Sequence, residues 1–239
     1  MDENLIVKRI LLYSKNYRKE HCDKFNKIEI QQDPLAALDF LFGSVFYGGI
    51  SDEIATKERD ITFNYIKENY LNKILDLINN NKNYSEDIFI KKLKNLGVRN
   101  SKRGKMVYGI LKWISQMDDN NCINYSINYI KNKKIAELYN QLTNDIYFIG
   151  PKKTALFLRY LVALYDLNEF LTDSDIKYIV PIDTYINQFL IKMGLKEETT
   201  ISYNNDIKLV LQWCKKVNIS PIDFDQGVWY AYKNDKLLF

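Results

Sequence analysis

The sequence predicts an all-α fold. Apolar residues recur at helical spacing along most of the chain, and no segment reads convincingly as a strand. Glycine (9) and proline (4) are scarce among 239 residues, which argues against many short strands joined by tight turns. Hydrophobic residues make up 46% of the chain, so it can bury a substantial core.

Helix-start signals mark the first half of the chain. Asp33 precedes Pro34, which pairs a capping side chain with a proline at the first helical position. Ser51 and Asn100 can cap two later helices, and Gly97 ends another. The expected helices are residues 4–20, 34 to the Gly48-Gly49 break, about 52–69, about 70–79, 85–96 and about 102–116.

The second half is read in the same way. Ile135 and Leu138 stand at helical spacing. Asp183 can cap a helix that Gly194 ends, and Ser220, followed by Pro221, can cap the last helix. Residues 166–180 are expected to form a loop or a short helix. The expected helices are residues 123–131, 133–145, about 152–165, about 184–193, 203–216 and 221–232.

Charge and composition limit the possible functions. The net charge of +4 permits nucleic-acid binding without requiring it. Cys22, Cys122 and Cys214 form no C-x-x-C pair, so neither a cysteine metal site nor a disulfide framework is expected. His21 is the only histidine, read as a surface residue, which counts against Ser-His-Asp and Cys-His catalysis. We expect no metal and no cofactor.

The sequence also gives expectations about location. No stretch approaches about 18 uninterrupted apolar residues, so no transmembrane helix is expected. The start, MDENLIVKR, lacks a signal-peptide pattern. We expect a cytoplasmic, nucleoid-associated monomer without membrane contact.

A short turn between two apolar-faced helices is the first candidate for chemistry. It lies in YFIGPKKTALFLRYL, residues 147–161, with Lys152 and Lys153 in the first turn of the second helix. The backbone N–H groups and the positive dipole end of that helix can hold a phosphate, and they favour a neutral amine. A neutral amine is a nucleophile. The alternative is an ordinary helix connection with two solvated lysines.

Three further segments carry candidate side chains. Asp183 is either only an N-cap or a carboxylate beside an active lysine. Asp225 and Trp229 share a helix face and could bind a flipped purine, although a core Trp with a surface Asp is the alternative. Basic residues in 93–111 suit either phosphate contact or a solvated face. These are Lys94, Arg99, Lys102, Arg103 and Lys105.

In this order, the segments resemble the helix-hairpin-helix DNA glycosylases, the superfamily of endonuclease III and the 8-oxoguanine glycosylases. The matching stretches are SVFYGGISDEIA, LGVRNSKRGKMV, FIGPKKTALFLR and IDTYI. The match runs from about Leu38 to Leu190, with a weaker one near the C-terminus. The chain looks most similar to the archaeal 8-oxoguanine glycosylases, a branch without an iron–sulfur cluster.

The resemblance implies a fold and a reaction. It implies a central helical subdomain, residues 34–165, which ends in the hairpin. A second subdomain combines residues 1–33 with 166–239, and a DNA-binding cleft lies between the two. The hairpin lysine attacks C1′ of a damaged nucleotide, a carboxylate stabilises the sugar cation, the base leaves, and β-elimination cuts the strand. The implied partner is double-stranded DNA containing a damaged base, with 8-oxoguanine as the expected lesion.

The resemblance also assigns residues. Lys152 is the expected nucleophile because it follows Gly150 by two residues, and Lys153 is the alternative because Lys-Thr-Ala aligns with endonuclease III. Asp183 is the expected carboxylate. The expected base-binding residues are Asp225 and Trp229, with Leu156 or Phe157 as the opposite wall. The expected DNA-backbone contacts are Ile149, Gly150, Pro151, Lys102 and Arg103.

Helix geometry supports Lys152 in that expectation. Thr154, Leu158, Leu161 and Tyr165 share an apolar face that should be packed. Lys152 projects from the opposite side, with Leu156 and Arg159, and could reach a cleft.

The chain departs from the family pattern in three places. Phe148 stands where the first hairpin glycine is usual, and Thr154 replaces a small alanine. Gly49 stands at the wedging glutamine of endonuclease III, which leaves Tyr47 or Ile50 as candidate wedges. Two rival functions stay open: a monofunctional glycosylase in which Asp183 activates water, and a non-catalytic DNA-binding module.

Overall fold

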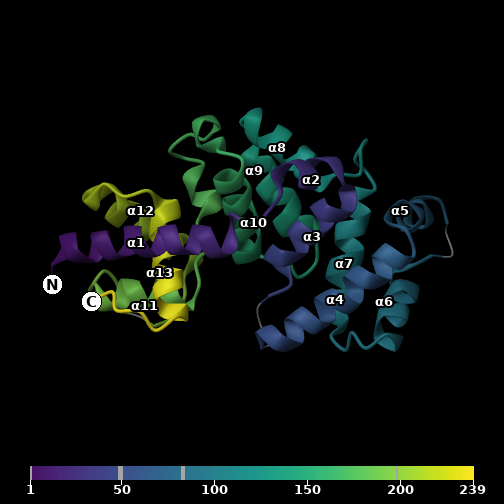
Figure 1. Ribbon diagram of the computed structural model, residues 1–239, viewed down its shortest axis with the longest axis horizontal. Coiled ribbons are helices and arrows are strands. Elements are labelled where there is room, and N and C mark those ends of the chain that lie inside the picture. The colour runs from purple at the N-terminus through teal and green to yellow at the C-terminus, as the bar shows by residue number, and fades with distance from the viewer. Residues whose placement is uncertain (1, 48–50, 82–83, 198) are drawn as a thin grey trace. The chain divides into compact units, whose positions relative to one another are not determined.

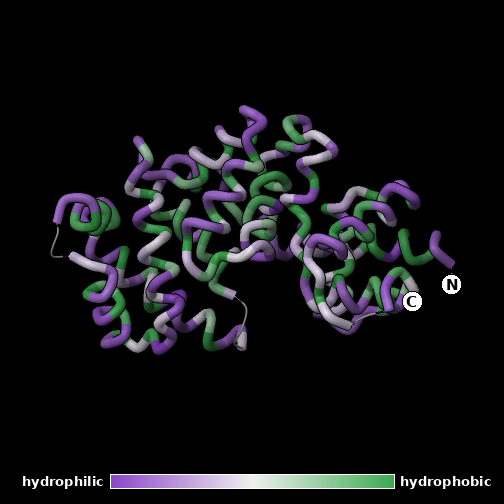
Figure 2. The backbone as a smooth tube through the Cα atoms, turned by 180° about the vertical axis from the view of Figure 1, so that it is seen from behind, coloured by the Kyte–Doolittle hydropathy of each residue, from purple (hydrophilic) through white to green (hydrophobic). Residues whose placement is uncertain are grey.

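The computed structural model describes residues 2–47, 51–81, 84–197 and 199–239. Within these ranges the regular secondary structure is entirely helical, which confirms the predicted fold class (Figure 1). Hydrophobic and hydrophilic residues alternate in short stretches along the helices, as in amphipathic helices (Figure 2).

Contacts between Cα atoms divide the chain into two compact units. Unit 1 comprises Met1–Phe25 and Leu158–Phe239, and unit 2 comprises Asn26–Phe157. The second boundary falls within α10 (Pro151–Leu164), whereas the sequence predicted it between residues 165 and 166. The first boundary lies at residues 25 and 26 instead of 33 and 34.

Unit 2 contains the helices that lead to the candidate lysines. Helices α3 and α7 are buried along much of their length and supply a large part of its core. Besides the start of α10, its elements are α2 (Lys27–Gln32), α3 (Pro34–Val45), α4 (Asp52–Glu68), α5 (Leu71–Asn80), α6 (Glu86–Asn95), α7 (Ser101–Ile114), α8 (Cys122–Lys131), α9 (Ile135–Asn140) and the π-helix η1 (Gln141–Asp145).

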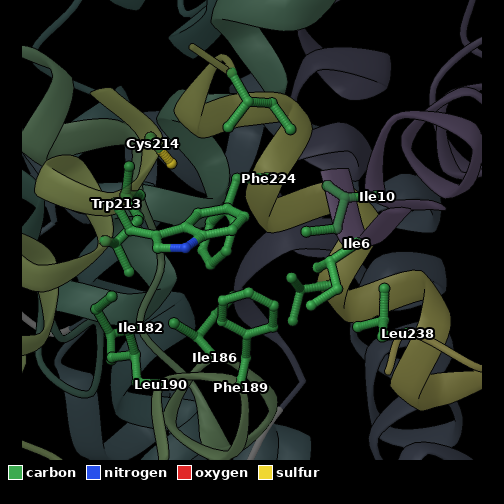
Figure 3. Close-up of a cluster of buried hydrophobic side chains, with 14 of the residues drawn as sticks. Ile6, Ile10, Ile182, Ile186, Phe189, Leu190, Trp213, Cys214, Phe224 and Leu238 are labelled. Atoms are coloured by element: carbon green, nitrogen blue, oxygen red, sulfur yellow. The ribbon is translucent and has the colours of Figure 1, made fainter. Parts of the chain in front are cut away.

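Unit 1 combines the N-terminal helix with the C-terminal third of the chain. Its buried core joins Ile10, Phe189, Trp213 and Phe224 from four different helices (Figure 3). The Phe189 ring lies 5.1 Å from that of Trp213 and 5.0 Å from that of Phe224, centroid to centroid. Besides the end of α10, its elements are α1 (Glu3–His21), two 3₁₀ turns, η2 (Leu167–Phe170) and η3 (Ile176–Ile179), α11 (Thr184–Lys192), α12 (Tyr203–Val217) and α13 (Pro221–Lys233).

The predicted capping residues begin the helices as expected. The side chains of Asp33, Ser51, Asn100, Asp183 and Ser220 each accept a hydrogen bond from a first-turn backbone N–H. Such a bond satisfies a donor that the helix itself leaves without a partner. These five helix starts were therefore readable from local sequence.

Helices α1 and α13 pack closely against each other in unit 1 (Figure 1). A Cβ atom added at Gly227 would lie 2.2 Å from the backbone oxygen of Ile10. We expect Gly227→Ala to lower the free energy of unfolding by about 1–3 kcal/mol, because backbone cannot move aside as a flexible side chain can.

Gly43 in α3 is the matched control for this prediction. A Cβ atom there would meet nothing within 4 Å. Gly43→Ala should therefore be neutral or stabilise the protein by up to about 1 kcal/mol, since alanine is the better helix former. Urea denaturation of both variants measures the difference, and equal effects would contradict the close packing at Gly227.

Candidate functional site

A tight turn, residues 146–150, joins η1 to α10. Phe148 has a φ of +68°, in the left-handed region that glycine adopts most easily. This is the position at which the family pattern has its first hairpin glycine. Thr143 in η1 donates to Thr154 in α10, with 3.1 Å between the two hydroxyl oxygens. The Thr154 hydroxyl thus has a partner across the turn.

Lys153 lies half-buried at the start of α10. Its Nζ is 3.8 Å from Sδ of Met106 in α7 and 4.1 Å from the centre of the Phe148 ring. Burial lowers the pKa of Lys153 to about 8, and the positive charges of Arg103 and Lys152 add to the effect. The environment therefore makes a larger share of the amine neutral and nucleophilic near physiological pH.

Lys152, the nucleophile that the glycine spacing favoured, is exposed to solvent. The expected packed face of α10 is present, since Thr154, Leu158 and Leu161 are fully buried. The opposite side is not uniformly open, however, because Arg159 is also buried. Of the two lysines, Lys153 has the surroundings that generate a nucleophile.

The predicted phosphate contacts at the turn are only partly available. The Ile149 N–H donates to the oxygen of Ile146 at 3.2 Å, and Pro151 has no N–H. Gly150 is the residue of this predicted trio whose N–H could serve a phosphate. The Ile149 side chain is buried in unit 2.

Arg103 is buried instead of reaching a phosphate. Its side chain pairs with Glu58, with 3.2 Å between Nη1 and Oε2, and it donates to the Phe46 oxygen. The expected phosphate contact is therefore corrected, because burial and these bonds commit the guanidinium. Lys102, one residue earlier, is exposed.

A small cavity opens beside the start of α7. Its volume is about 150 Å³, and Lys94, Arg99, Asn100 and Ser101 are among the residues that line it. Lys94, Arg99 and Lys105 are exposed. This region of unit 2 is therefore rich in cations at its surface.

Asp183 begins α11 in unit 1 and is 8% exposed. Its Oδ1 accepts from the N–H groups of Tyr185 at 2.9 Å and Ile186 at 3.0 Å. The expected N-cap is confirmed, and the positive end of the α11 dipole stabilises the carboxylate.

Asp225 is buried in unit 1, which corrects the alternative of a surface Asp. It forms an ion pair with Arg159, whose Nη2 donates to the Tyr17 hydroxyl. Both charged side chains are at most 3% exposed. This pairing was not predicted from the sequence, where the visible signal is a lone arginine in the apolar run LFLRYLVAL.

The other predicted base-binding residues differ in exposure. Trp229 is half-buried, and its ring makes edge contacts with Tyr17 and His21, each at 5.5 Å between centroids. His21 is thus half-buried in an aromatic cluster and is not a plain surface residue. Phe157 packs in the core of unit 2 against Phe40, with the rings 6.3 Å apart.

Leu156 and Tyr47, a wall candidate and a wedge candidate, lie in unit 2. Leu156 is half-buried. The Tyr47 hydroxyl lies 3.2 Å from that of Thr56. Gly49 and Ile50 lie outside the described residues.

Comparison of the chain with protein-family models, curated proteins and solved structures finds no match. In the described part of the chain, no three or more His, Cys, Asp or Glu side chains gather as a metal site would need. None of the described helices has the length and apolarity to cross a membrane.

Proposed function

We propose that the protein is a bifunctional DNA glycosylase and AP lyase that acts on double-stranded DNA containing a damaged base. The observation that carries the proposal is the half-buried Lys153 amine, whose pKa is lowered to about 8, at the start of a helix that follows a tight turn. In this proposal η1, the turn and α10 form a helix-hairpin-helix motif within a fold of two helical subdomains.

The proposed reaction starts at the Lys153 amine. Its lone pair attacks C1′, the bond from C1′ to the base nitrogen breaks, and the base leaves with the electron pair and takes up a proton. The nitrogen then loses one proton, and its lone pair forms the C1′=N bond of a protonated Schiff base as the C1′–O4′ bond breaks and O4′ takes up a proton. Loss of a C2′ proton expels the 3′-phosphate and cuts the strand. Water finally hydrolyses the Schiff base and releases the lysine, so no further reactant is needed.

Two features of unit 2 support DNA as the partner. The N-terminus of α10 has the dipole and the N–H donors that bind phosphate in many proteins. Lys94, Arg99, Lys102 and Lys105 add exposed positive charge near α7. Phosphate contacts of this kind position DNA without reading its sequence.

Unit 1 contains the carboxylate and the aromatic ring to which we assign roles in the reaction. Asp183 is the residue that we propose to stabilise the sugar cation. The proposed base is 8-oxoguanine, with Trp229 as the stacking ring. Asp225 would act there only as part of its buried pair with Arg159. Association with the nucleoid and action as a monomer are parts of the same proposal.

The two roles of Asp183 can be separated by substitution. Asp183→Asn keeps a side-chain oxygen for the α11 cap but removes the charge, so stability should hold while the rate of base release falls about 100-fold. Asp183→Ala should also lower the free energy of unfolding by about 1 kcal/mol. Single-turnover base release and urea denaturation measure the two effects. A fully active Asp183→Asn variant would contradict the proposed role.

A panel of lesion duplexes tests the proposed function. Duplexes carrying 8-oxoguanine opposite cytosine, uracil opposite guanine, or an abasic site are incubated with the protein, with and without borohydride. We expect release of 8-oxoguanine, strand cleavage and a covalent adduct that borohydride traps. Base release without an adduct would favour the monofunctional rival. DNA binding without base release or cleavage would favour the binding module.

A further inference from the structure

The buried pair of Arg103 and Glu58 plays no part in the proposed reaction, yet it is held firmly in unit 2. Nε and Nη2 of Arg103 lie 3.4 and 3.1 Å from the Phe46 oxygen, and Nη1 lies 3.2 Å from Glu58 Oε2. Oε1 of Glu58 accepts from the N–H groups of Arg99 and Asn100 at 2.9 and 3.2 Å. The guanidinium therefore has a fixed position.

The same face of α7 carries both Arg103 and the residue that touches Lys153. Arg103 and Met106 are three residues apart, so their side chains leave the helix on one side. Met106 Sδ contacts Nζ of Lys153 at 3.8 Å, and the Phe148 ring covers the amine from the turn. Both contacts are uncharged, and burial places the amine in surroundings that screen a nearby fixed charge less than water does.

We propose that Arg103 is a positioning residue whose fixed positive charge favours the neutral, reactive form of the Lys153 amine. This inference deepens the proposed function and rests on it, because the role of the Lys153 amine is that of the nucleophile in the proposed reaction. It also assigns a role to Arg103, which was expected to contact a phosphate but is buried. Arginine suits the task because, unlike lysine or histidine, it keeps its charge at every relevant pH.

The charges around Lys153 agree with this inference. Burial has the largest effect on its ammonium, and the cations Arg103 from α7 and Lys152 from α10 add to it in that order. With a pKa of about 8, the amine is neutral in about one molecule in ten at pH 7, against about one in 3,000 for a pKa of 10.5. Removing the Arg103 charge should raise the pKa and reduce the neutral fraction.

The pH dependence of Lys153 acetylation tests the inference without DNA. Acetic anhydride attacks neutral amines, and mass spectrometry reports the modification of Lys153 separately from that of exposed Lys131. The test variant is Glu58→Gln with Arg103→Met, which removes both charges and keeps an acceptor for the Arg99 and Asn100 amides. We expect the Lys153 profile to move to higher pH, with about threefold or more loss of rate at pH 7.

Two single variants separate electrostatics from packing. Arg103→Lys keeps the charge and should leave the profile near that of the wild type. Lys152→Gln removes a surface charge that lowers the pKa of Lys153 less than Arg103 does. It should therefore raise the midpoint pH of Lys153 acetylation by less than the double variant does. An unchanged profile in a folded double variant would overturn the inference. So would an Arg103→Lys profile displaced as far as that of the double variant.

The wild-type protein provides a test that no folding failure can affect. NMR titration of ¹³C-methylated lysines gives the pKa of Lys153 directly, and a value near 10.5 would overturn the inference. If the titration gives about 8 but DNA yields no adduct, the proposed function fails while the tuned amine stands. If DNA does yield an adduct, the pH profile of trapping should shift in the double variant as the acetylation profile does.

Discussion

Lys153→Gln is expected to abolish the covalent adduct that borohydride traps, with the rate falling about 1,000-fold or more. The amide has no lone pair that can attack C1′, so no Schiff base can form. Single-turnover trapping on an abasic duplex measures this loss, because it isolates the lyase step from recognition of the base.

Two other lysines are the controls for this prediction. Lys152→Gln should still form the adduct, at a reduced rate at pH 7, because removing its charge raises the pKa of Lys153. Lys131→Gln, an exposed position on α8, should react as the wild type does. A Lys153→Gln variant that forms adduct at the wild-type rate would remove Lys153 from the reaction.

Asp225→Ala is expected to lower the free energy of unfolding by about 3–5 kcal/mol. It leaves the buried Arg159 guanidinium without its carboxylate partner, and an uncompensated buried charge is costly. Urea denaturation followed by circular dichroism measures the effect. The Tyr17 hydroxyl bond to Arg159 remains in the variant and cannot replace the lost charge.

A double variant separates the charge from the space it fills. Arg159→Met with Asp225→Leu removes both charges and refills the volume with apolar atoms, so it should recover most of the lost stability. Recovery would show that the unpaired charge caused the loss. If Asp225→Ala lowers the free energy of unfolding by less than about 1 kcal/mol, the ion pair of Arg159 and Asp225 contributes less to stability than its burial implies.

Much of the fold could be predicted because its signals are local. Capping residues such as Asp33 and Ser51 lie next to the helices they begin, and Gly97 and Gly194 adopt the positive φ angles that end helices. Helix α2 was missed because its six residues, KIEIQQ, are too few for a periodic pattern. The helix expected over residues 133–145 begins at Ile135, and its last five residues form a π-helix.

The candidate site was less predictable because its deciding contacts join distant segments. Spacing from Gly150 favoured Lys152, whereas Lys153 is set apart by Met106, which lies 47 residues earlier in the chain. Arg103 looked like one of several surface cations until Glu58, 45 residues away, was seen to pair with it. Local sequence reports spacing along a helix, but it does not report which charge is buried against which partner.

The central claim is that the Lys153 amine attacks the sugar, and mapping the trapped adduct tests it most directly. The wild-type protein is reacted with an abasic duplex and borohydride and digested, and the modified peptide is sequenced by mass spectrometry. The account predicts the sugar fragment on Lys153. A fragment on Lys152 or on any other residue, or no adduct from active protein, would contradict it.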